Sequence, residues 1–397
     1  MIHSFGLQVP AQILFGPGRL RDLGEIVPRF GRRPLLVLGS ASFAATDHYQ
    51  ALLATFRQLN ISPQTVHIGT EPSPEIIDGI VAGIVAGQDG AARDMVIAIG
   101  GGSALDAGKV LAAMLVEKGG VTRFLEGVGN GGKPSGRKLP FVAVPTTSGT
   151  GSEATSNAVI SSVGENGFKR SLRHDNYIPN LALIDPALTL SCPRKLTVAC
   201  SMDCFTQLVE GYLASHGSRP TDTLALDGIR AVWRSLEVVC RDGGNLAART
   251  DMAYGALLSG IVLANAGLGT VHGFASAIGG FFAVPHGVVC GTLMAETNRL
   301  TVQRLRQAGT NPEALRKYAT LGRICGTAAD KTESWYQDFF IEELARLTGE
   351  LEIPRLDELG IGRDDTDKIV GQTSNKYNPA QLSPEELRAI LLARMSS

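Results

Sequence analysis

The chain has 397 residues, of which 44% are hydrophobic and 19% charged, so it can bury a sizeable core and does not have the composition of a disordered protein. Its 37 Lys and Arg residues against 38 Asp and Glu give a net charge of −1, which argues against nucleic-acid or membrane-surface partners. With 47 glycines, 6% aromatic residues, no secretory signal at residues 1–10 and six cysteines that form no CxxC pair, we expect a cytoplasmic α/β enzyme with reduced thiols.

Short β-type runs alternate with helical stretches through the first half of the chain. Strands are predicted at residues 34–38, 65–68, 95–99, 141–144 and 181–184. Helical periodicity fills intervening stretches such as 49–59 and 75–85. This alternation predicts a mostly parallel sheet covered by helices, and such sheets bind ligands at the carboxyl ends of their strands.

The pattern changes after Asp185 and Pro186. Helical periodicity predicts helices at residues 196–214, 222–240, 248–266, 313–325, 334–348 and 384–394, with little that is typical of a strand. The sequence therefore predicts two domains, an α/β domain at residues 1–185 and an all-helical domain at residues 186–397.

The first glycine-rich turn follows the predicted strand at 95–99. Gly100, Gly101 and Gly102 precede Ser103 and a helix, a context in which backbone N–H groups at the helix start can meet a phosphate. Asp106 could cap that helix, or orient a ribose or a nicotinamide amide. A tight turn without a ligand is the alternative, and the GxGxxG pattern of an ordinary dinucleotide fold is absent.

A second loop, at residues 145–155, follows the next predicted strand and is rich in hydroxyl groups and glycine. Its candidate donors to phosphate or ribose oxygens are Thr146, Thr147, Thr150 and Ser152. A polar surface turn would have the same composition. Because both loops follow strands of one sheet, we expect a shared nucleotide site.

The helical half supplies candidate metal ligands. Asp203, Gln207 and Glu210 recur on one helix face, a spacing most often found on a solvated face. His272 and His286 lie in a glycine-rich apolar stretch, where a single histidine is usually a core residue. Together with Asp203, they offer the nitrogen and oxygen ligands that suit Zn²⁺ or Fe²⁺. Cys290 shares the face of His286 if that segment is helical, although a packed thiol is the favoured interpretation.

These blocks together resemble the iron-containing (group III) alcohol dehydrogenases over nearly the whole chain. Residues 100–109 are similar to the family's GGGSxxDxAK pyrophosphate loop, and residues 145–153 to its PTTSGTGSE loop. Residues 201–203 are similar to its GMDAL motif, residues 271–272 and 284–287 to its paired-histidine motif, and residues 377–379 to a short C-terminal motif. The resemblance implies a dehydroquinate synthase-like architecture: an α/β nucleotide-binding domain followed by an all-helical metal and substrate domain. It also implies reversible hydride transfer between a nicotinamide cofactor and an alcohol or aldehyde, in a homodimer or larger homo-oligomer.

The metal site implied by the resemblance departs from the family pattern. The family's Asp, His, His, His set falls on Asp203, Gln207, His272 and His286, so glutamine replaces one histidine. A neutral amide oxygen is a weaker ligand, but three protein ligands suffice for a catalytic site. We therefore expect a weakly bound Fe or Zn ion, with Asp203, His272 and His286 as the catalytic set. A further family histidine corresponds to Ser276, which puts any proton relay built on that histidine in doubt.

The implied cofactor site also departs from the family. Its members are Gly39, Ser40, Gly101, Gly102, Ser103, Asp106, Thr146, Thr147, Thr150, Ser152, Asn157 and Lys169. The family often has an aspartate near Gly39 that repels a 2′-phosphate. Its absence removes that repulsion, Ser40 could donate to the phosphate, and Arg21, Arg32 or Arg33 could lie close. NADP is therefore expected to be accepted alongside NAD.

Other readings stay open. A maleylacetate reductase-like or glycerol dehydrogenase-like reductase, a dehydroquinate synthase-like lyase and a metal-free member with altered activity share this architecture. A scaffold that binds without catalysing also stays open, because Gln207 and Ser276 replace two histidines.

Overall fold

A computed structural model describes residues 4–39, 41–87 and 93–396. The α/β half contains a six-stranded parallel sheet in the order β1-β8-β5-β4-β2-β3. Its strands are β1 (Gln12–Phe15), β2 (Pro34–Leu38), β3 (Gln64–His67), β4 (Met95–Gly100), β5 (Phe141–Pro145) and β8 (Leu181–Ile184). The five predicted strands are confirmed, and β1 is an addition at the sheet edge.

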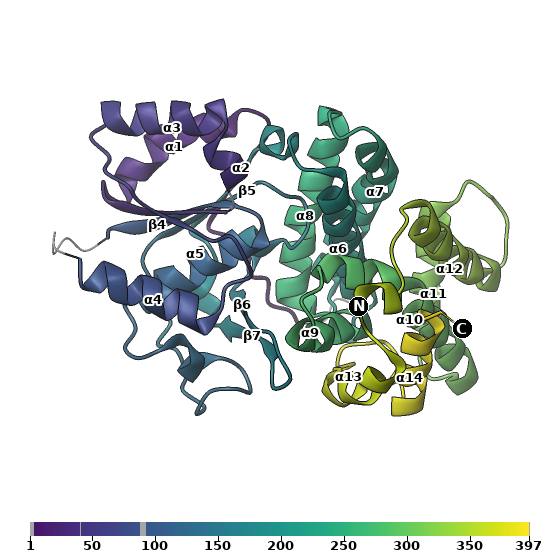
Figure 1. Cartoon of the computed structure of the whole chain (residues 1–397). Coiled ribbons are helices and arrows are strands. Elements are labelled where there is room, and N and C mark those ends of the chain that lie inside the picture. Colours follow the sequence, from purple (N-terminus) through teal and green to yellow (C-terminus); the bar gives the residue numbers. More distant parts are fainter. Residues whose placement is uncertain (1–3, 40, 88–92, 397) are drawn as a thin grey trace.

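Helices cover both faces of this sheet (Figure 1). One face packs on α4 (Pro74–Val85) and α5 (Gly102–Met114), the other on α1 (Leu23–Ile26) and α3 (Asp47–Gln58), while the short α2 (Ala41–Ala44) follows β2. Side chains alternate between the two faces: Leu35 and Val37 join the first core, and Leu36 and Leu38 the second. Burial on both faces explains why these strands are continuously apolar.

The carboxyl ends of β2, β4 and β5 lie side by side. In the parallel register Leu38 pairs with Ile99, and Gly100 pairs with Pro145. The segments that leave these strands, including both glycine-rich loops, therefore meet at one edge of the sheet.

A separate antiparallel hairpin follows the second loop. It consists of β6 (Asn157–Ser162) and β7 (Phe168–Arg173), in which Ser161 pairs with Lys169. The hairpin packs against α5 and also against α9 of the helical half, and the N–H of Gly164 donates to the carbonyl of Gly280 at 3.2 Å. It therefore connects the two halves of the molecule.

From residue 186 to residue 396 the chain contains helices and no strand. The helices are α6 (Arg194–Leu213), α7 (Arg219–Arg241), α8 (Leu246–Ala266), α9 (Thr270–Phe281), α10 (His286–Ala308), α11 (Pro312–Cys325), α12 (Glu333–Glu350), α13 (Thr366–Gln372) and α14 (Pro384–Ala393). All six predicted helices are confirmed, and α9, α10 and α13 were not predicted. The expected fold class, an α/β half followed by a helical half, is thereby confirmed.

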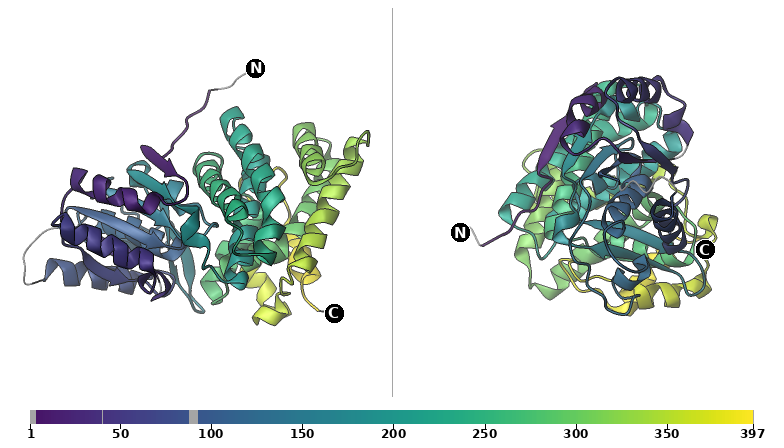
Figure 2. Two further views of the ribbon diagram at one scale, coloured as in Figure 1. Left: turned by 90° about the horizontal axis from the view of Figure 1, so that it is seen from above. Right: turned by 90° about the vertical axis from the view of Figure 1, so that its left-hand side faces the viewer.

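The α/β half and the helical half lie next to one another, and the N-terminal segment extends from the body (Figure 2). The backbone N–H of Gln8 in this segment donates to Oδ1 of Asn265 on α8. Within the part of the chain that the structure describes, no single helix is long and apolar enough to span a membrane. The helices α8 and α9 pass that test only as a pair, and the pair is bent by 96°.

Candidate functional site

The first glycine-rich turn is packed so tightly that side chains are excluded from it. A Cβ atom on Gly102 would lie 2.6 Å from Cγ2 of Thr150, and one on Gly100 would lie 3.1 Å from the backbone nitrogen of Gly39. No side chain caps the start of α5, so its first N–H groups are free toward a ligand. The glycines thus bring the segments after β2, β4 and β5 into contact.

Lys109 fastens the second loop to α5. Its Nζ donates to Oγ1 of Thr155 at 2.8 Å and to the carbonyl oxygens of Ser152 and Asn157 at 2.8 and 2.7 Å. Burial lowers the pKa of Lys109 to about 8, against the opposing charges of Asp106 and Glu153. The loop is therefore fixed in place by a buried cation, and sequence reasoning assigned Lys109 no such role.

Asp106 also connects α5 to the loop and the hairpin. Its carboxylate accepts hydrogen bonds from Oγ of Ser152 at 2.5 Å and from the N–H of Val159 at 3.1 Å. Asp106 does not cap α5, whose N-cap is Gly101 with no side-chain cap. Its carboxylate still lines the cleft, so a contact with a ribose or an amide remains a prediction.

The hairpin holds Lys169 over the site. Nζ of Lys169 lies 2.5 Å from Oε1 of Glu71, and Oγ of Ser161 donates to Oε2 of Glu71 at 2.6 Å. Burial opposes ionisation of Glu71, but the charge and hydrogen bond of Lys169 outweigh it and lower the pKa of Glu71. Sequence reasoning missed Glu71, which follows β3 and meets the hairpin only in the folded chain.

Not all predicted cofactor residues line the cleft. Those that do are Gly102, Ser103, Asp106, Thr150, Ser152, Asn157 and Lys169, whereas Gly39, Gly101, Thr146 and Thr147 do not line it. Ser40 falls outside the described residues. The suggestion that Arg32 and Arg33 lie near Gly39 is wrong, because both precede β2, at its opposite end, where Asp94 accepts hydrogen bonds from their backbone N–H groups.

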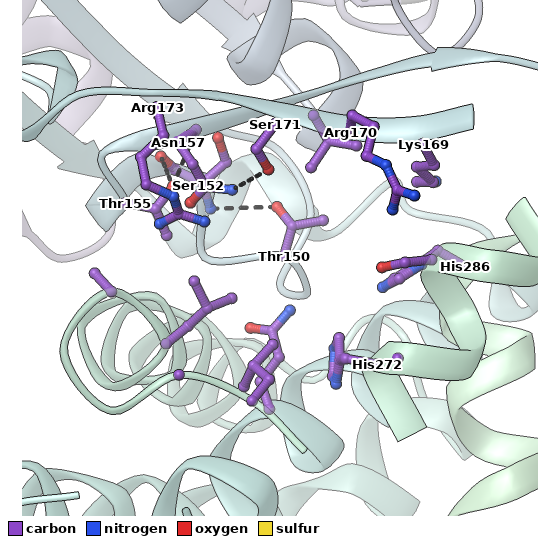
Figure 3. Close-up of a pocket in the computed structure, with 18 of the residues that line it drawn as sticks. Thr150, Ser152, Thr155, Asn157, Lys169, Arg170, Ser171, Arg173, His272 and His286 are labelled. Atoms are coloured by element: carbon purple, nitrogen blue, oxygen red, sulfur yellow. Dashed lines mark hydrogen bonds between the residues drawn. The ribbon is translucent and has the colours of Figure 1, made fainter. Parts of the chain in front are cut away.

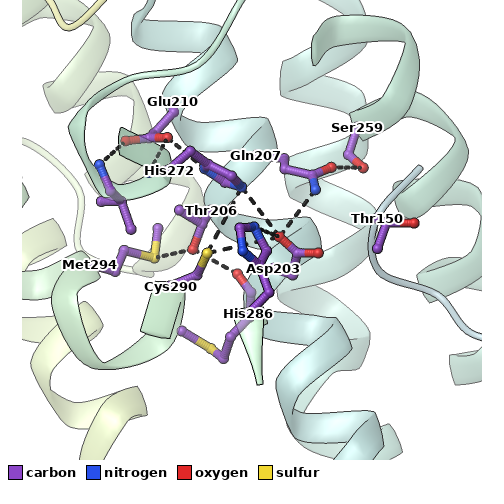
Figure 4. A network of polar contacts seen from close by, with 12 residues as sticks. Thr150, Asp203, Thr206, Gln207, Glu210, Ser259, His272, His286, Cys290 and Met294 are labelled. Atoms are coloured by element: carbon purple, nitrogen blue, oxygen red, sulfur yellow. Dashed lines mark hydrogen bonds and ion pairs between the residues drawn. The ribbon is translucent and has the colours of Figure 1, made fainter. Parts of the chain in front are cut away.

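The candidate metal ligands converge on Asp203 (Figure 4). Its Oδ1 lies 3.3 Å from Nε2 of His272 and 3.7 Å from Nε2 of His286. Asp203 projects from α6, while the histidines come from α9 and from the first residue of α10. Three helices that are distant in sequence thus bring one oxygen and two nitrogens together.

The expectation that Asp203, Gln207 and Glu210 lie on a solvent-exposed face of α6 is wrong. Asp203, Gln207 and Glu210 are only 3%, 3% and 5% exposed, because α9 and α10 cover this face. Buried polar groups need partners, and each of the three has one. Oε2 of Glu210 lies 2.7 Å from Nδ1 of His272, which leaves Nε2 of that ring facing Asp203.

Gln207 presents its amide nitrogen, and not its oxygen, to the cluster. Its Nε2 donates to Oδ1 of Asp203 at 3.1 Å, and its Oε1 accepts from Oγ of Ser259 at 2.8 Å. A further residue completes the group: Sγ of Cys290 lies 3.9 Å from both Oδ1 of Asp203 and Nε2 of His272.

The ionisation states of the cluster differ from those of exposed groups. Burial lowers the pKa of His286 to about 4, so this ring is neutral near pH 7. Burial opposes ionisation of Asp203, but the hydrogen bond and the charge of His272 hold the pKa of Asp203 below its usual value. Burial favours the neutral form of His272, but its hydrogen bonds to Asp203 and Glu210 outweigh burial and raise the pKa of the ring. A carboxylate and an available imidazole nitrogen are the forms that bind a cation.

One cleft of about 840 Å³ joins the two sets of residues. Figure 3 shows the second loop and the hairpin on one wall, with His272 and His286 on the other. Ser276, one turn after His272, also lines the cleft. A volume of this size is typical of ligand sites.

Comparison with known proteins decides the family. Residues 10–186 match the model of iron-containing alcohol dehydrogenase, and residues 197–395 match the C-terminal model of the same family. The chain belongs to the iron-containing alcohol dehydrogenase family. It is therefore an oxidoreductase that transfers a hydride between a nicotinamide cofactor and an alcohol or aldehyde.

Relatives with known names span about three quarters or more of this iron-containing alcohol dehydrogenase. Alcohol dehydrogenase 4 of Saccharomyces cerevisiae is 30% identical over 394 residues, and the match covers 97% of both chains. Long-chain-alcohol dehydrogenase 1 of Geobacillus thermodenitrificans is 32% identical over 353 residues, covering 87% of this chain and 85% of its own. The NAD-dependent methanol dehydrogenase of Bacillus methanolicus is 29% identical over 300 residues, covering 73% of this chain and 77% of its own.

Solved structures agree with this assignment. A 1,3-propanediol oxidoreductase superposes with a TM-score of 0.87 at 27% identity, and the match covers 99% of this chain and 100% of the other. The alcohol dehydrogenase from Oenococcus oeni has the same TM-score at 26% identity, with the same coverage. The fold and the family thus rest on both sequence and structure.

Proposed function

We propose that Asp203, His272 and His286 hold a divalent metal at one end of the cleft, and that the nicotinamide cofactor extends from Ser103 to Lys169. The observation that carries this proposal is the single cleft lined by both the nucleotide loops and the carboxylate–histidine cluster. Separate cavities would not allow the two groups to act on one substrate. We therefore assign the family's hydride-transfer reaction to these residues.

The residues present fit a metal ion. The ligand atoms of Asp203, His272 and His286 lie within 4.8 Å of one another. Glu210 fixes His272 by the carboxylate–histidine contact that commonly supports metal ligands. A divalent metal bound there would supply a Lewis acid for the substrate oxygen.

The chain's own residues position the reactants. Lys109 and Asp106 fix the second loop, and the free N–H groups at the start of α5 would bind the phosphates of the cofactor. Lys169, paired with Glu71, holds a cation over the end of the cleft nearest His286, as expected for a group that contacts the nicotinamide ribose. Gln207 donates to Asp203 and so orients the carboxylate toward the histidines.

For the cofactor, we propose that NADP is accepted alongside NAD. Gly39 follows β2 next to Gly100, and it carries no carboxylate that would repel a 2′-phosphate. Arg32 and Arg33 give it no support, because both lie at the opposite end of β2.

We also propose a cytoplasmic homodimer. Phe5, Leu7 and Val9 are 50%, 42% and 41% exposed at alternate positions of the N-terminal segment, which Figure 2 shows extending from the body. Alternate positions of an extended chain share one face, and β1 is an edge strand of the sheet. An apolar extended segment beside a sheet edge is suited to pairing with a second copy.

A metal-free enzyme is the second candidate. The observation that favours it is the hydrogen bond that the amide of Gln207 donates to Asp203. At this position the family has a histidine that binds the metal. Metal content distinguishes the two candidates directly.

The experiment compares the unaltered enzyme with Asp203→Ala, His286→Ala and a control, His48→Ala, whose side chain is exposed. Metal per chain is measured together with aldehyde reduction by NADH and by NADPH. We expect both site variants to lose the metal and about a thousandfold or more in kcat, in line with several kcal/mol of Lewis-acid stabilisation. Wild-type turnover in either variant would refute the metal role, and strict NADH use would refute the cofactor proposal.

A further inference from the structure

Cys290 lies within the metal cluster, and we propose that its sulfur is the fourth protein ligand of this enzyme in place of Gln207. This inference rests on the proposed function, because it concerns the same metal. Cys290 follows His286 by four residues on α10, so both side chains point to the same side of the helix. Its side chain is fully buried.

The distances fit four-coordinate geometry. Tetrahedral bonds of about 2.0 Å to nitrogen or oxygen and about 2.3 Å to sulfur place such ligands about 3.3 Å (N to O) and about 3.5 Å (S to N) apart. In this chain, Oδ1 of Asp203 lies 3.3 Å from Nε2 of His272 and 3.7 Å from Nε2 of His286. Sγ of Cys290 lies 3.9 Å from Oδ1 of Asp203 and 3.9 Å from Nε2 of His272. All four donors already lie within 4.8 Å of one another, so shifts of about an ångström or less would bring them around one ion.

Gln207 is already committed to other partners. Its amide nitrogen orients Asp203, and its oxygen accepts from Ser259 on α8. As a ligand, its oxygen would have to leave Ser259 and turn toward the carboxylate. Gln207 is thus a positioning residue in this arrangement, and Cys290 supplies the donor that the family obtains from histidine.

The consequence concerns which metal is held. A thiolate is a soft ligand that favours zinc over the harder cations magnesium and manganese. Binding exchanges the thiol proton for the metal–sulfur bond, and that proton leaves to solvent. The geometry points to an Asp, His, His, Cys set that favours zinc over magnesium and manganese.

The test uses Co²⁺ as a spectroscopic probe on the full-length, metal-free protein. A cobalt–thiolate bond gives an intense charge-transfer absorption in the near ultraviolet, whereas nitrogen and oxygen ligands give only weak visible bands. We expect the unaltered chain to bind one Co²⁺ with the intense band. Cys290→Ser should keep the visible bands, lose the ultraviolet band and bind Zn²⁺ more than about tenfold more weakly.

Two further variants separate the alternatives. Cys240→Ser removes a buried thiol of α7 outside the cluster and should leave the spectrum unchanged. Gln207→Ala should keep the ultraviolet band. Stoichiometric cobalt binding without that band, or its survival in Cys290→Ser, would overturn the thiolate ligand and leave the proposed function intact. Failure to bind cobalt at all would overturn both.

Discussion

Glu153 is a carboxylic acid with almost no access to water. It is 2% exposed in the second loop, and burial raises its pKa to about 7 against the nearby charge of Lys109. In the unfolded chain the same group titrates near 4.5. Between these values the folded state keeps a proton that the unfolded state has lost, so the free energy of unfolding falls as the pH rises through this window.

Replacing Glu153 with glutamine removes this dependence. We expect the unaltered enzyme to lose at most about 3 kcal/mol of stability from pH 4.5 to pH 7 relative to Glu153→Gln, because each pKa unit corresponds to about 1.4 kcal/mol. Thermal unfolding midpoints measured at pH 5 and pH 8 test this, with the exposed Glu165→Gln as the control. The same pH slope in Glu153→Gln and the unaltered chain would show that Glu153 is ionised in the folded state.

The residues of the site differ in how far sequence could identify them. Asp203, His272 and His286 were proposed as ligands from their oxygen and nitrogen donors, and the resemblance to the family points to the same positions. Glu71 and the partners of Lys109 could not be predicted, since those contacts join segments that are distant in sequence. The polar stripe on α6 was assigned to solvent because its spacing is the same whether water or another helix covers it.

Among the elements, α8 and the second loop come closest where the backbones of Gly151 and Gly260 meet. Gly151, at a φ of +64°, lies against Gly260 of α8, and a Cβ on Gly260 would come 2.1 Å from the carbonyl oxygen of Gly151. No side chain can move to relieve that contact. The pair therefore sets the separation between the helical half and the nucleotide loop.

The variant Gly260→Ala tests this contact. We expect about 1–3 kcal/mol of destabilisation from overpacking, and a cofactor affinity at least about tenfold weaker because the loop must move. The matched control is Gly79→Ala in α4, where nothing lies within 4 Å and alanine favours the helix. Calorimetry and a cofactor titration give the two readouts. Unchanged affinity in Gly260→Ala would mean that the loop position does not depend on this contact.

The strand and helices that the sequence did not predict are stabilised by contacts with distant parts of the chain. The strand β1 has only four residues and is stabilised by pairing with β8, far along the chain. The helices α9 and α10 begin with glycine-rich or valine-rich turns that have low helix propensity, and packing against α6 and each other stabilises them. Local patterns predicted β2, β4 and β5, whose burial on both faces leaves a continuous apolar run.

At the scale of the whole molecule, the N-terminal segment governs the proposed assembly. We expect the unaltered chain to sediment as a dimer at micromolar concentration, and Leu7→Asp to weaken the dimer about tenfold or more by placing a charge in an apolar strand face. Analytical ultracentrifugation over a concentration series measures this. Val85→Asp, which charges an exposed valine on α4, is the control. A monomeric unaltered chain would contradict the proposal, as would an equally stable Leu7→Asp dimer.

The apolar cluster of α6 and α8 also includes Ala154, Ala182 and Ile184 from the α/β half. The boundary proposed near residue 186 therefore separates two patterns of secondary structure but crosses one continuous interior. Cutting the chain there would expose the shared apolar core of both pieces to water. Each half thus depends on the other for part of its folding energy, and heat should melt them in a single cooperative event.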